Sequence, residues 1–388
     1  MNKIAKGLLK IYASFIKKSD EYILFESAYD FYDNSFVLYK YIKEHYPQYK
    51  LKYLITSKEM KKHGPSQGVS PKEMIHVKNK LKLYKYSLKS KVIFFSYLNY
   101  WKKLKLQDST RVVYLNHGEF PIKDCSEYYN YLFSVPQENK IDIVMGTKHI
   151  DEVLSKKYPV LNNHPHVVVG APRNDEMFES ILTKEELLKK LGVKENTNKQ
   201  IILSMTTFRN KENEGVDYFE KEFPISLSLE KLKELDKHLD KNSQILIIKL
   251  HHEQLGVKVP SGLKNIVIID NKKLGELNLT INLLYGVCDS LITDYSSAFL
   301  SYLNLDRPVA FILADFEKYS QNLGFTIENI ESIMPGEKIY TLEELTKYFD
   351  NLHKGIDTYK NQRKEICLKF SGNYHNQNCK SVTDHYLK

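Results

Sequence analysis

From about residue 20 onward, short apolar runs alternate with longer amphipathic segments. Apolar runs of this length, rich in β-branched and aromatic residues, are typical of strands buried in a parallel sheet. They predict strands over residues 22–27, 52–56, 91–97, 111–116, 141–146 and 166–170, and then over 201–205, 244–250, 265–270, 290–293 and 308–313. Because helical patterns separate the runs, we expect an α/β protein whose parallel sheets are covered on both faces.

A polar stretch near residues 180–200 interrupts this alternation and divides the 388-residue chain into two halves of similar size. This length is typical of two domains. We predict Rossmann-like domains over residues 19–185 and 195–365, with a ligand cleft between them. A last helical segment, residues 366–388, could return to brace the first domain.

Residues 1–18 have an amphipathic pattern of their own. Ile4, Leu8, Ile11 and Phe15 recur at helical spacing, and five lysines lie largely off that stripe. The pattern is compatible with a helix packed on the protein's own core or with a basic helix lying on an anionic membrane. No run of 18 apolar residues and no signal-peptide pattern occurs, so we expect a protein that is neither exported nor membrane-spanning.

Charge and cysteine content narrow the class of protein. The 57 Lys and Arg residues against 48 Asp and Glu residues give a net charge of +9, which favours anionic partners. Acids are interleaved with the lysines, as on solvated helix faces, so we expect no binding to nucleic acid. The four cysteines lie far apart without C-x-x-C spacing, which argues against a zinc site or a disulfide framework and fits a reducing cytoplasm.

The segment "LITDYSSAFLSYL", residues 291–303, places Asp294, Tyr295, Ser296 and Ser297 between a predicted strand and a helix. In open parallel sheets, ligands bind beyond the carboxyl ends of the strands, where helix N-termini point at them. The two serines are expected at the N-cap and in the first turn, where hydroxyl groups and free backbone N–H groups suit a phosphate. A plain helix cap is the alternative interpretation, but it leaves the acid and the phenol unexplained.

A histidine follows the predicted strand of residues 111–116. "RVVYLNHG" ends in Asn116, His117 and Gly118. An imidazole at a strand end, followed by a glycine that frees the backbone, suits a general base near neutral pH. A structural hydrogen-bonding role is the alternative for a lone histidine.

The predicted strand of residues 244–250 ends in a similar way. "LIIKLHHEQ" contains Lys249, His251 and His252. Residues two apart in an extended segment point to the same side, so Lys249 and His251 suit two contacts with one phosphoryl group. We favour His251 over His252, since neighbours on a strand point to opposite faces and no carboxylate spacing completes a metal site.

Two further segments also follow predicted strands. "VVVGAPRND" offers Arg173, Asn174 and Asp175, and "ILSMTTFRN" offers Thr207 and Arg209. An arginine at such a position can hold phosphate oxygens with two hydrogen bonds. We therefore predict that these five residues contribute to substrate binding.

In chain order, the motifs NHG, GAPRND, TTFR, KLHH and ITDYSS, followed by RPVAFIL, resemble the CDP-glycerol glycerophosphotransferase family of teichoic-acid and capsule biosynthesis. The resemblance runs from about Leu24 to "MPGEKIYTLEEL" near residue 345. It implies a GT-B-like fold, with an N-terminal acceptor domain and a C-terminal CDP-alditol-binding domain facing a central cleft. The two motif histidines of the family carry over to His117 and His251, and its Asp-Tyr-Ser-Ser segment carries over to residues 294–297.

The resemblance also implies an activity. Such enzymes transfer glycerol phosphate or ribitol phosphate from CDP-glycerol or CDP-ribitol to a lipid-linked acceptor, with release of CMP. We therefore expect a polyprenyl-diphosphate-linked saccharide as acceptor, at the anionic inner face of the cell membrane. His117 would accept the acceptor's proton, and Lys249, His251 and Arg209 would balance charge on the pyrophosphate.

No cofactor is required by the sequence, although Mg²⁺ accompanying a pyrophosphate donor is compatible with it. Asn116, His252 and Ser301 stand where the family commonly has Trp, Pro and an acid, so the alditol and the acceptor stay open. Three other classes stay open as well: a nucleotide-sugar glycosyltransferase on the same scaffold, a UDP-sugar 2-epimerase of similar fold, and a non-catalytic scaffold protein.

Overall fold

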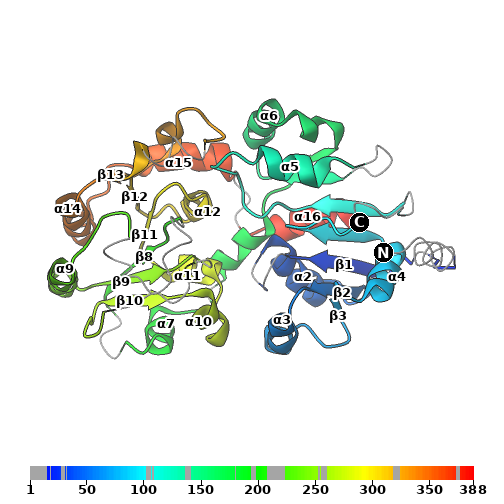
Figure 1. The fold of residues 1–388 in the computed structure, drawn as a ribbon, viewed down its shortest axis with the longest axis horizontal. Helices are drawn as coiled ribbons and strands as arrows, with labels where there is room; N and C mark the ends of the chain where they lie inside the picture. Colours follow the sequence, from blue (N-terminus) through cyan, green and yellow to red (C-terminus); the bar gives the residue numbers. More distant parts are fainter. Residues whose placement is uncertain are drawn as a thin grey trace. The chain divides into compact units, whose positions relative to one another are not determined.

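The computed structural model describes residues 15–17, 19–27, 31, 33–101, 106, 109–135, 141–179, 181–193, 198–207, 223–251, 254, 260–317, 324–372 and 376–388. The chain forms two compact units. The first comprises Met1–Glu119, Cys125–Glu176 and Gly372–Lys388, and the second comprises Phe120–Asp124 and Met177–Ser371. Each unit is built on one parallel sheet with helices packed against it (Figure 1).

The sheet of the first unit has seven strands in the order β3-β2-β1-β4-β5-β6-β7, and all neighbouring pairs are parallel. The strands are β1 (Tyr22–Glu26), β2 (Lys50–Ile55), β3 (Met74–His76), β4 (Val92–Phe95), β5 (Arg111–Tyr114), β6 (Asp142–Met145) and β7 (His166–Val168). The strand order reverses between β1 and β4. In open parallel sheets this reversal is where ligands bind, beyond the carboxyl ends of the strands.

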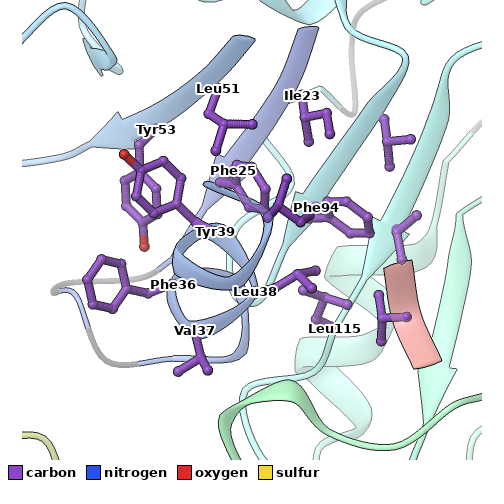
Figure 2. Close-up of a cluster of buried hydrophobic side chains, with 14 of the residues drawn as sticks. Ile23, Phe25, Phe36, Val37, Leu38, Tyr39, Leu51, Tyr53, Phe94 and Leu115 are labelled. Atoms are coloured by element: carbon purple, nitrogen blue, oxygen red, sulfur yellow. The ribbon is translucent and has the colours of Figure 1, made fainter. Parts of the chain in front are cut away.

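Helix α2 (Asn34–His45) shows how local sequence builds this unit. Asp33 accepts a hydrogen bond from the first backbone N–H group of the helix, and the buried face of the helix packs against the sheet. Figure 2 shows Phe25 of β1 and Phe94 of β4 beside Leu38 and Tyr39 of α2. The other helices of the unit are α3 (Lys58–His63), α4 (Lys80–Lys89), α5 (Ser126–Phe133), α6 (Lys148–Lys157) and α16 (Asn378–Tyr386), with 3₁₀ turns η1 (Gly64–Gln67) and η2 (Pro159–Asn163).

Helix α16 belongs to the first unit although it lies at the end of the sequence. It packs against α2: the Tyr46 hydroxyl lies 3.3 Å from the Thr383 hydroxyl oxygen. The ring of Tyr386 meets that of Phe94 edge to face, with centroids 5.7 Å apart. The terminal helix therefore closes one side of the first core.

The sheet of the second unit repeats the same topology with six parallel strands in the order β10-β9-β8-β11-β12-β13. They are β8 (Gln200–Ser204), β9 (Gln244–Lys249), β10 (Ile266–Ile269), β11 (Ser290–Thr293), β12 (Val309–Ile312) and β13 (Glu337–Ile339). Here the order reverses between β8 and β11. Both units therefore have the strand order of a Rossmann fold.

Helices of the second unit are α7 (Lys184–Lys190), α9 (Leu229–Lys241), α10 (Asn271–Glu276), α11 (Ile281–Val287), α12 (Ala298–Tyr302), α14 (Leu342–His353) and α15 (Lys360–Phe370), with 3₁₀ turns η4 (Leu303–Leu305) and η5 (Ile330–Ile333). A further 3₁₀ turn, η3 (Pro172–Phe178), spans the junction of the two units. Helix α14 begins with a capping box in which Thr341 and Glu344 exchange side-chain-to-backbone hydrogen bonds. None of the described helices is long and apolar enough to cross a bilayer.

All eleven predicted strands are present, and the expectation of parallel α/β sheets is confirmed. The sequence did not indicate β3 or β13. Both are three residues long, lie at a sheet edge and contain partly exposed residues, so neither produces a continuous apolar run.

Candidate active site

The turn after β5 presents His117. Asn116 adopts a left-handed backbone conformation with φ of 61°, which asparagine tolerates better than most residues. Its side chain donates a hydrogen bond to the carbonyl oxygen of Val144, and its own carbonyl oxygen accepts one from Asn34 at 2.9 Å. Asn116 therefore shapes the turn, and His117 follows on a fixed backbone.

His117 is paired with a buried aspartate. Its Nδ1 lies 2.9 Å from Oδ2 of Asp33, whose side chain is 3% exposed, whereas the imidazole is 48% exposed. A carboxylate that accepts a hydrogen bond from Nδ1–H leaves Nε2 as the nitrogen that can accept a proton. Sequence analysis missed Asp33. The available signal was its place before the apolar pattern of α2, but that signal indicates a helix cap and not a partner 84 residues away.

Two other side chains meet the His117 turn. The ring of Tyr97, which follows β4, packs edge-on to the imidazole with centroids 5.5 Å apart. Arg173 donates from Nη1 to the backbone carbonyl of His117 at 2.8 Å, and its own N–H donates to Asn34 at 2.9 Å. Arg173 thus lies against the backbone of His117, while its part in substrate binding stays a prediction.

The neighbours of Arg173 have structural partners. Asn174 donates a hydrogen bond to Glu119, and both side chains are buried. The carboxylate of Asp175 accepts from the backbone N–H groups of Asn378 and Cys379 at 2.9 and 2.7 Å, and so holds the N-terminus of α16. These contacts give Asn174 and Asp175 a role in stability, while substrate binding by either stays a prediction.

In the second unit, Thr207 follows β8 and Asp294 follows β11, the two strands between which the order reverses. Asp294 is fully buried, and its Oδ2 accepts from the backbone N–H and the hydroxyl of Thr207 at 2.8 and 2.9 Å. The carboxylate therefore ties the two strand ends together. Asp294 thus fixes the local backbone, while substrate binding by it stays a prediction.

The residues after Asp294 divide into buried and partly exposed groups. The buried Tyr295 donates from its hydroxyl to Asp315 at 2.9 Å. Ser297 is the N-cap residue of α12, yet in the described part of the chain its hydroxyl makes no capping hydrogen bond. Ser296 Oγ accepts a 3.3 Å hydrogen bond from the backbone N–H of Ala298. Capping alone thus does not account for the Ser297 hydroxyl.

Lys249 is the last residue of β9. Burial lowers the pKa of its ammonium group to about 8, and the charge of Asp270 opposes this only in part. No carboxylate among the described residues forms an ion pair with Lys249. A partly buried cation at a strand end, without an ion-pair partner among the described residues, is a candidate for holding an anionic ligand.

Two hydrogen bonds link His251 to Gln254. Its backbone N–H donates to Gln254 Oε1 at 2.6 Å, and the Gln254 N–H donates back to the carbonyl oxygen of His251 at 3.0 Å. Arg209 and His252 lie outside the described residues, as does the predicted basic helix of residues 1–18 apart from residues 15–17. In the described ranges, no group of three or more His, Cys, Asp or Glu side chains could hold a metal ion.

The family model for CDP-glycerol:poly(glycerophosphate) glycerophosphotransferases matches residues 9–384. The chain belongs to this family. The match covers nearly the whole sequence, including the segments around His117, His251 and Asp294. The family expected from the sequence motifs is therefore confirmed.

Individual glycerophosphotransferase relatives are more distant. The chain is 32% identical over 191 residues to a teichoic acid poly(glycerol phosphate) polymerase of Bacillus spizizenii, a match spanning 48% of this chain and 43% of the relative. It is 26% identical over 194 residues to the teichoic acid ribitol-phosphate polymerase TarL of Staphylococcus aureus, spanning 48% of this chain and 31% of TarL. The matched part is thus less than half of each polymerase.

Among solved structures, a variant of the wall teichoic acid polymerase TagF superposes with a TM-score of 0.75 over 97% of this chain and 92% of the TagF chain. At 20% sequence identity this likeness shows the fold. The expected GT-B-like fold, with two Rossmann-like parallel-sheet units, is therefore confirmed.

Proposed function

We propose that this glycerophosphotransferase-family protein transfers glycerol phosphate or ribitol phosphate from a CDP-alditol to a hydroxyl group and releases CMP. The observation that carries the proposal is the Asp33–His117 pair, in which a buried carboxylate orients a half-exposed imidazole at a strand end. This is the arrangement of a general base. Membership of the family supplies the reaction class.

In the proposed reaction, the acceptor hydroxyl oxygen attacks the phosphorus atom of the alditol phosphate. The new phosphorus–oxygen bond forms while the bond to the bridging oxygen of the pyrophosphate breaks, and CMP leaves with that electron pair. His117 Nε2 takes the hydroxyl proton, while Asp33 holds Nδ1–H and stabilises the imidazolium that forms. General-base catalysis of this kind contributes about 10²–10⁴-fold.

The donor is assigned to groups of the second unit. Phosphoryl transfer is mostly positioning and charge stabilisation, and the Lys249 ammonium supplies a positive charge that no described carboxylate neutralises. The hydroxyls of Ser296 and Ser297 supply hydrogen-bond donors for phosphate oxygens. His251 and Arg209 complete the proposed donor site on the strength of the sequence motifs.

The proposed acceptor is a polyprenyl-diphosphate-linked saccharide at the anionic inner face of the cell membrane. The resemblance of the sequence motifs to the family implies this acceptor, and the basic amphipathic pattern of residues 1–18 supports contact with anionic lipid. Both glycerol phosphate and ribitol phosphate stay in the proposal, because the relatives include polymerases of each kind.

The test is to incubate the purified protein with CDP-glycerol and, separately, with CDP-ribitol, together with a lipid-linked disaccharide. CMP release and an acceptor mass increased by one or more alditol-phosphate units are the expected results. Adding EDTA to a parallel reaction tests whether Mg²⁺ accompanies the donor. Release of UDP from a UDP-sugar, with no CMP from either CDP-alditol, would refute the proposal in favour of a glycosyltransferase.

A further inference from the structure

A second acid lies where the strand order of the first sheet reverses. Glu26 is the last residue of β1, which pairs with β4, and its side chain is completely buried. Its Oε2 accepts hydrogen bonds from the backbone N–H groups of Tyr97 and Leu98, both at 3.2 Å. Its Oε1 is also buried and has no hydrogen-bond partner among the described residues. A buried polar atom without a partner is costly, and such atoms concentrate at functional sites.

The surroundings of Glu26 favour its neutral form. Burial raises the pKa of the carboxyl group to about 8; the backbone N–H groups of Tyr97 and Leu98 oppose the rise, and the negative charge of Asp33 adds to it. Other titratable or charged groups lie at this end of the sheet, which we call the His117 corner. They are Asp33 before α2, Tyr97 after β4, His117 after β5, Tyr128 on α5 and Arg173 on η3. At neutral pH Glu26 is therefore a neutral carboxylic acid.

The second unit provides an internal comparison. Asp294 also bridges the two strand ends at the reversal of its sheet, but both of its carboxylate oxygens accept hydrogen bonds from Thr207. Bridging strand ends is thus achieved there with an acid that has donors on both oxygens. Among the described residues no donor reaches Oε1 of Glu26, and bridging the strand ends does not require this.

We propose that Glu26 is a positioning residue for the Asp33–His117 pair and holds the Tyr97 segment against the imidazole. The contacts form one chain: Glu26 binds the backbone of Tyr97, the Tyr97 ring packs on His117, and His117 binds Asp33. A neutral acid completes this chain without placing a second negative charge beside Asp33.

Ionisation of Glu26 would disturb the chain in two ways. A charged Oε1 without a donor would draw water or a rearranged backbone into the corner, and so displace the Tyr97 segment. Repulsion between the two carboxylates would also act on Asp33, which must stay 2.9 Å from His117 Nδ1. Turnover should therefore fall at alkaline pH, as Glu26 loses its proton.

The test compares wild type with Glu26→Gln, which keeps the shape of the neutral acid but cannot ionise. Glu73→Gln is the matched control: burial acts to raise the pKa of Glu73, but contacts with Lys43 and Ser70 outweigh it and lower the pKa overall. The kcat for CMP release is measured from pH 6 to 9.5 at saturating donor, and each variant is compared with wild type at every pH, because Lys249 titrates in the same range and its loss of a proton lowers turnover equally in all three proteins. This readout rests on the proposed function.

At pH 7, Glu26→Gln should match wild type within about twofold. Above pH 8, wild type and Glu73→Gln should lose up to about tenfold more kcat per pH unit than Glu26→Gln does. Superimposable profiles for wild type and Glu26→Gln would overturn the proposal. A loss above about 100-fold in Glu26→Gln at pH 7 would also overturn it, since Glu26 would then take part in the chemistry directly.

A second readout separates this inference from the proposed function. In protein carrying isotope-labelled histidine, the ring signals of His117, identified by their absence in His117→Ala, should shift near pH 8 in wild type and not in Glu26→Gln. If no CMP is released by any protein but this shift is seen, the proposed function fails and the coupling of Glu26 to His117 stands. If the shift near pH 8 is the same in both proteins, the coupling is refuted whatever the activity.

Discussion

Replacing Asp33 by Asn tests the general-base assignment with little change to the fold. Asp33 has two jobs: Oδ1 caps α2 through the N–H of Asn34 at 2.6 Å, and Oδ2 accepts from His117 Nδ1 at 2.9 Å. Asparagine is as good an N-cap as aspartate, so Asp33→Asn retains the cap and should unfold at nearly the wild-type temperature. What changes is the partner of the imidazole.

The expected loss follows from that partner. A hydrogen bond to a charged group is worth about 1.5–3 kcal/mol, which corresponds to roughly 10- to 150-fold in rate. An amide can also offer an N–H group to Nδ1, which favours the tautomer whose Nε2 carries hydrogen and cannot accept a proton. The two effects together predict that Asp33→Asn lowers kcat by about 10²–10⁴-fold, with the donor KM unchanged.

The assay is steady-state CMP release with CDP-glycerol and the lipid-linked acceptor. Thr147→Asn, a cap-preserving change at the N-terminus of α6 in the same unit, is the control and should keep full activity. In a His117→Ala background, Asp33→Asn should cause almost no further loss, because Asp33 acts through the imidazole. A near-normal kcat in Asp33→Asn, or independent losses in the double variant, would refute the reasoning.

Three other expected outcomes concern binding and stability. The affinity for CDP-glycerol, measured by calorimetry, should fall as pH rises through about 8, because the Lys249 ammonium loses its proton. The Lys249→Met variant should bind CDP-glycerol more weakly, with an affinity that does not change with pH. Equal pH dependence in both proteins would contradict the assignment of Lys249 to the donor site. Ser296→Ala combined with Ser297→Ala should weaken CMP and CDP-glycerol binding more than it lowers the melting temperature; unchanged affinity would make this segment structural. Since the folded pKa of Glu26 lies above the unfolded value of 4.5, stability falls as pH rises from 4.5 to about 8. Glu26→Gln should therefore raise the unfolding free energy by about 3 kcal/mol at pH 7 and by little at pH 4.5, whereas Glu73→Gln should not.

The fold was predictable because most strands are buried on both faces. A run such as residues 244–250 carries its signal in its own side chains, and no knowledge of its neighbours is needed to interpret it. The edge strands β3 and β13 lack that signal, since their pairing with β2 and β12 depends on the rest of the sheet being formed. Strands whose side chains are mostly buried can thus be predicted from a single sequence, and partly exposed edge strands cannot.

The same distinction applies to the site. His117, Lys249 and Ser297 were predicted as site residues because polar residues directly after an apolar run lie at the carboxyl edge of a parallel sheet. Asp33 was not, because its partner is 84 residues away and its local pattern indicates only a helix cap. Sequence patterns predict the sheet edge at which a site forms. Side-chain pairs such as Asp33 and His117 form only on folding, so the sequence pattern does not disclose them.

Glu26 shows where sequence interpretation could go further. It was included in the predicted strand of residues 22–27 as one member of an apolar run, although an ionisable residue at the buried end of such a run conflicts with it. In both sheets the reversal of strand order is bridged by an acid, Glu26 in one and Asp294 in the other. Both carboxylate oxygens of Asp294 accept hydrogen bonds from Thr207, whereas Oε1 of Glu26 has no hydrogen-bond partner among the described residues. An acid at the end of an apolar strand is therefore a sequence signal for a carboxyl group whose pKa is shifted by burial. The difference in hydrogen bonding between Glu26 and Asp294 supports a link between Glu26 and the Asp33–His117 pair.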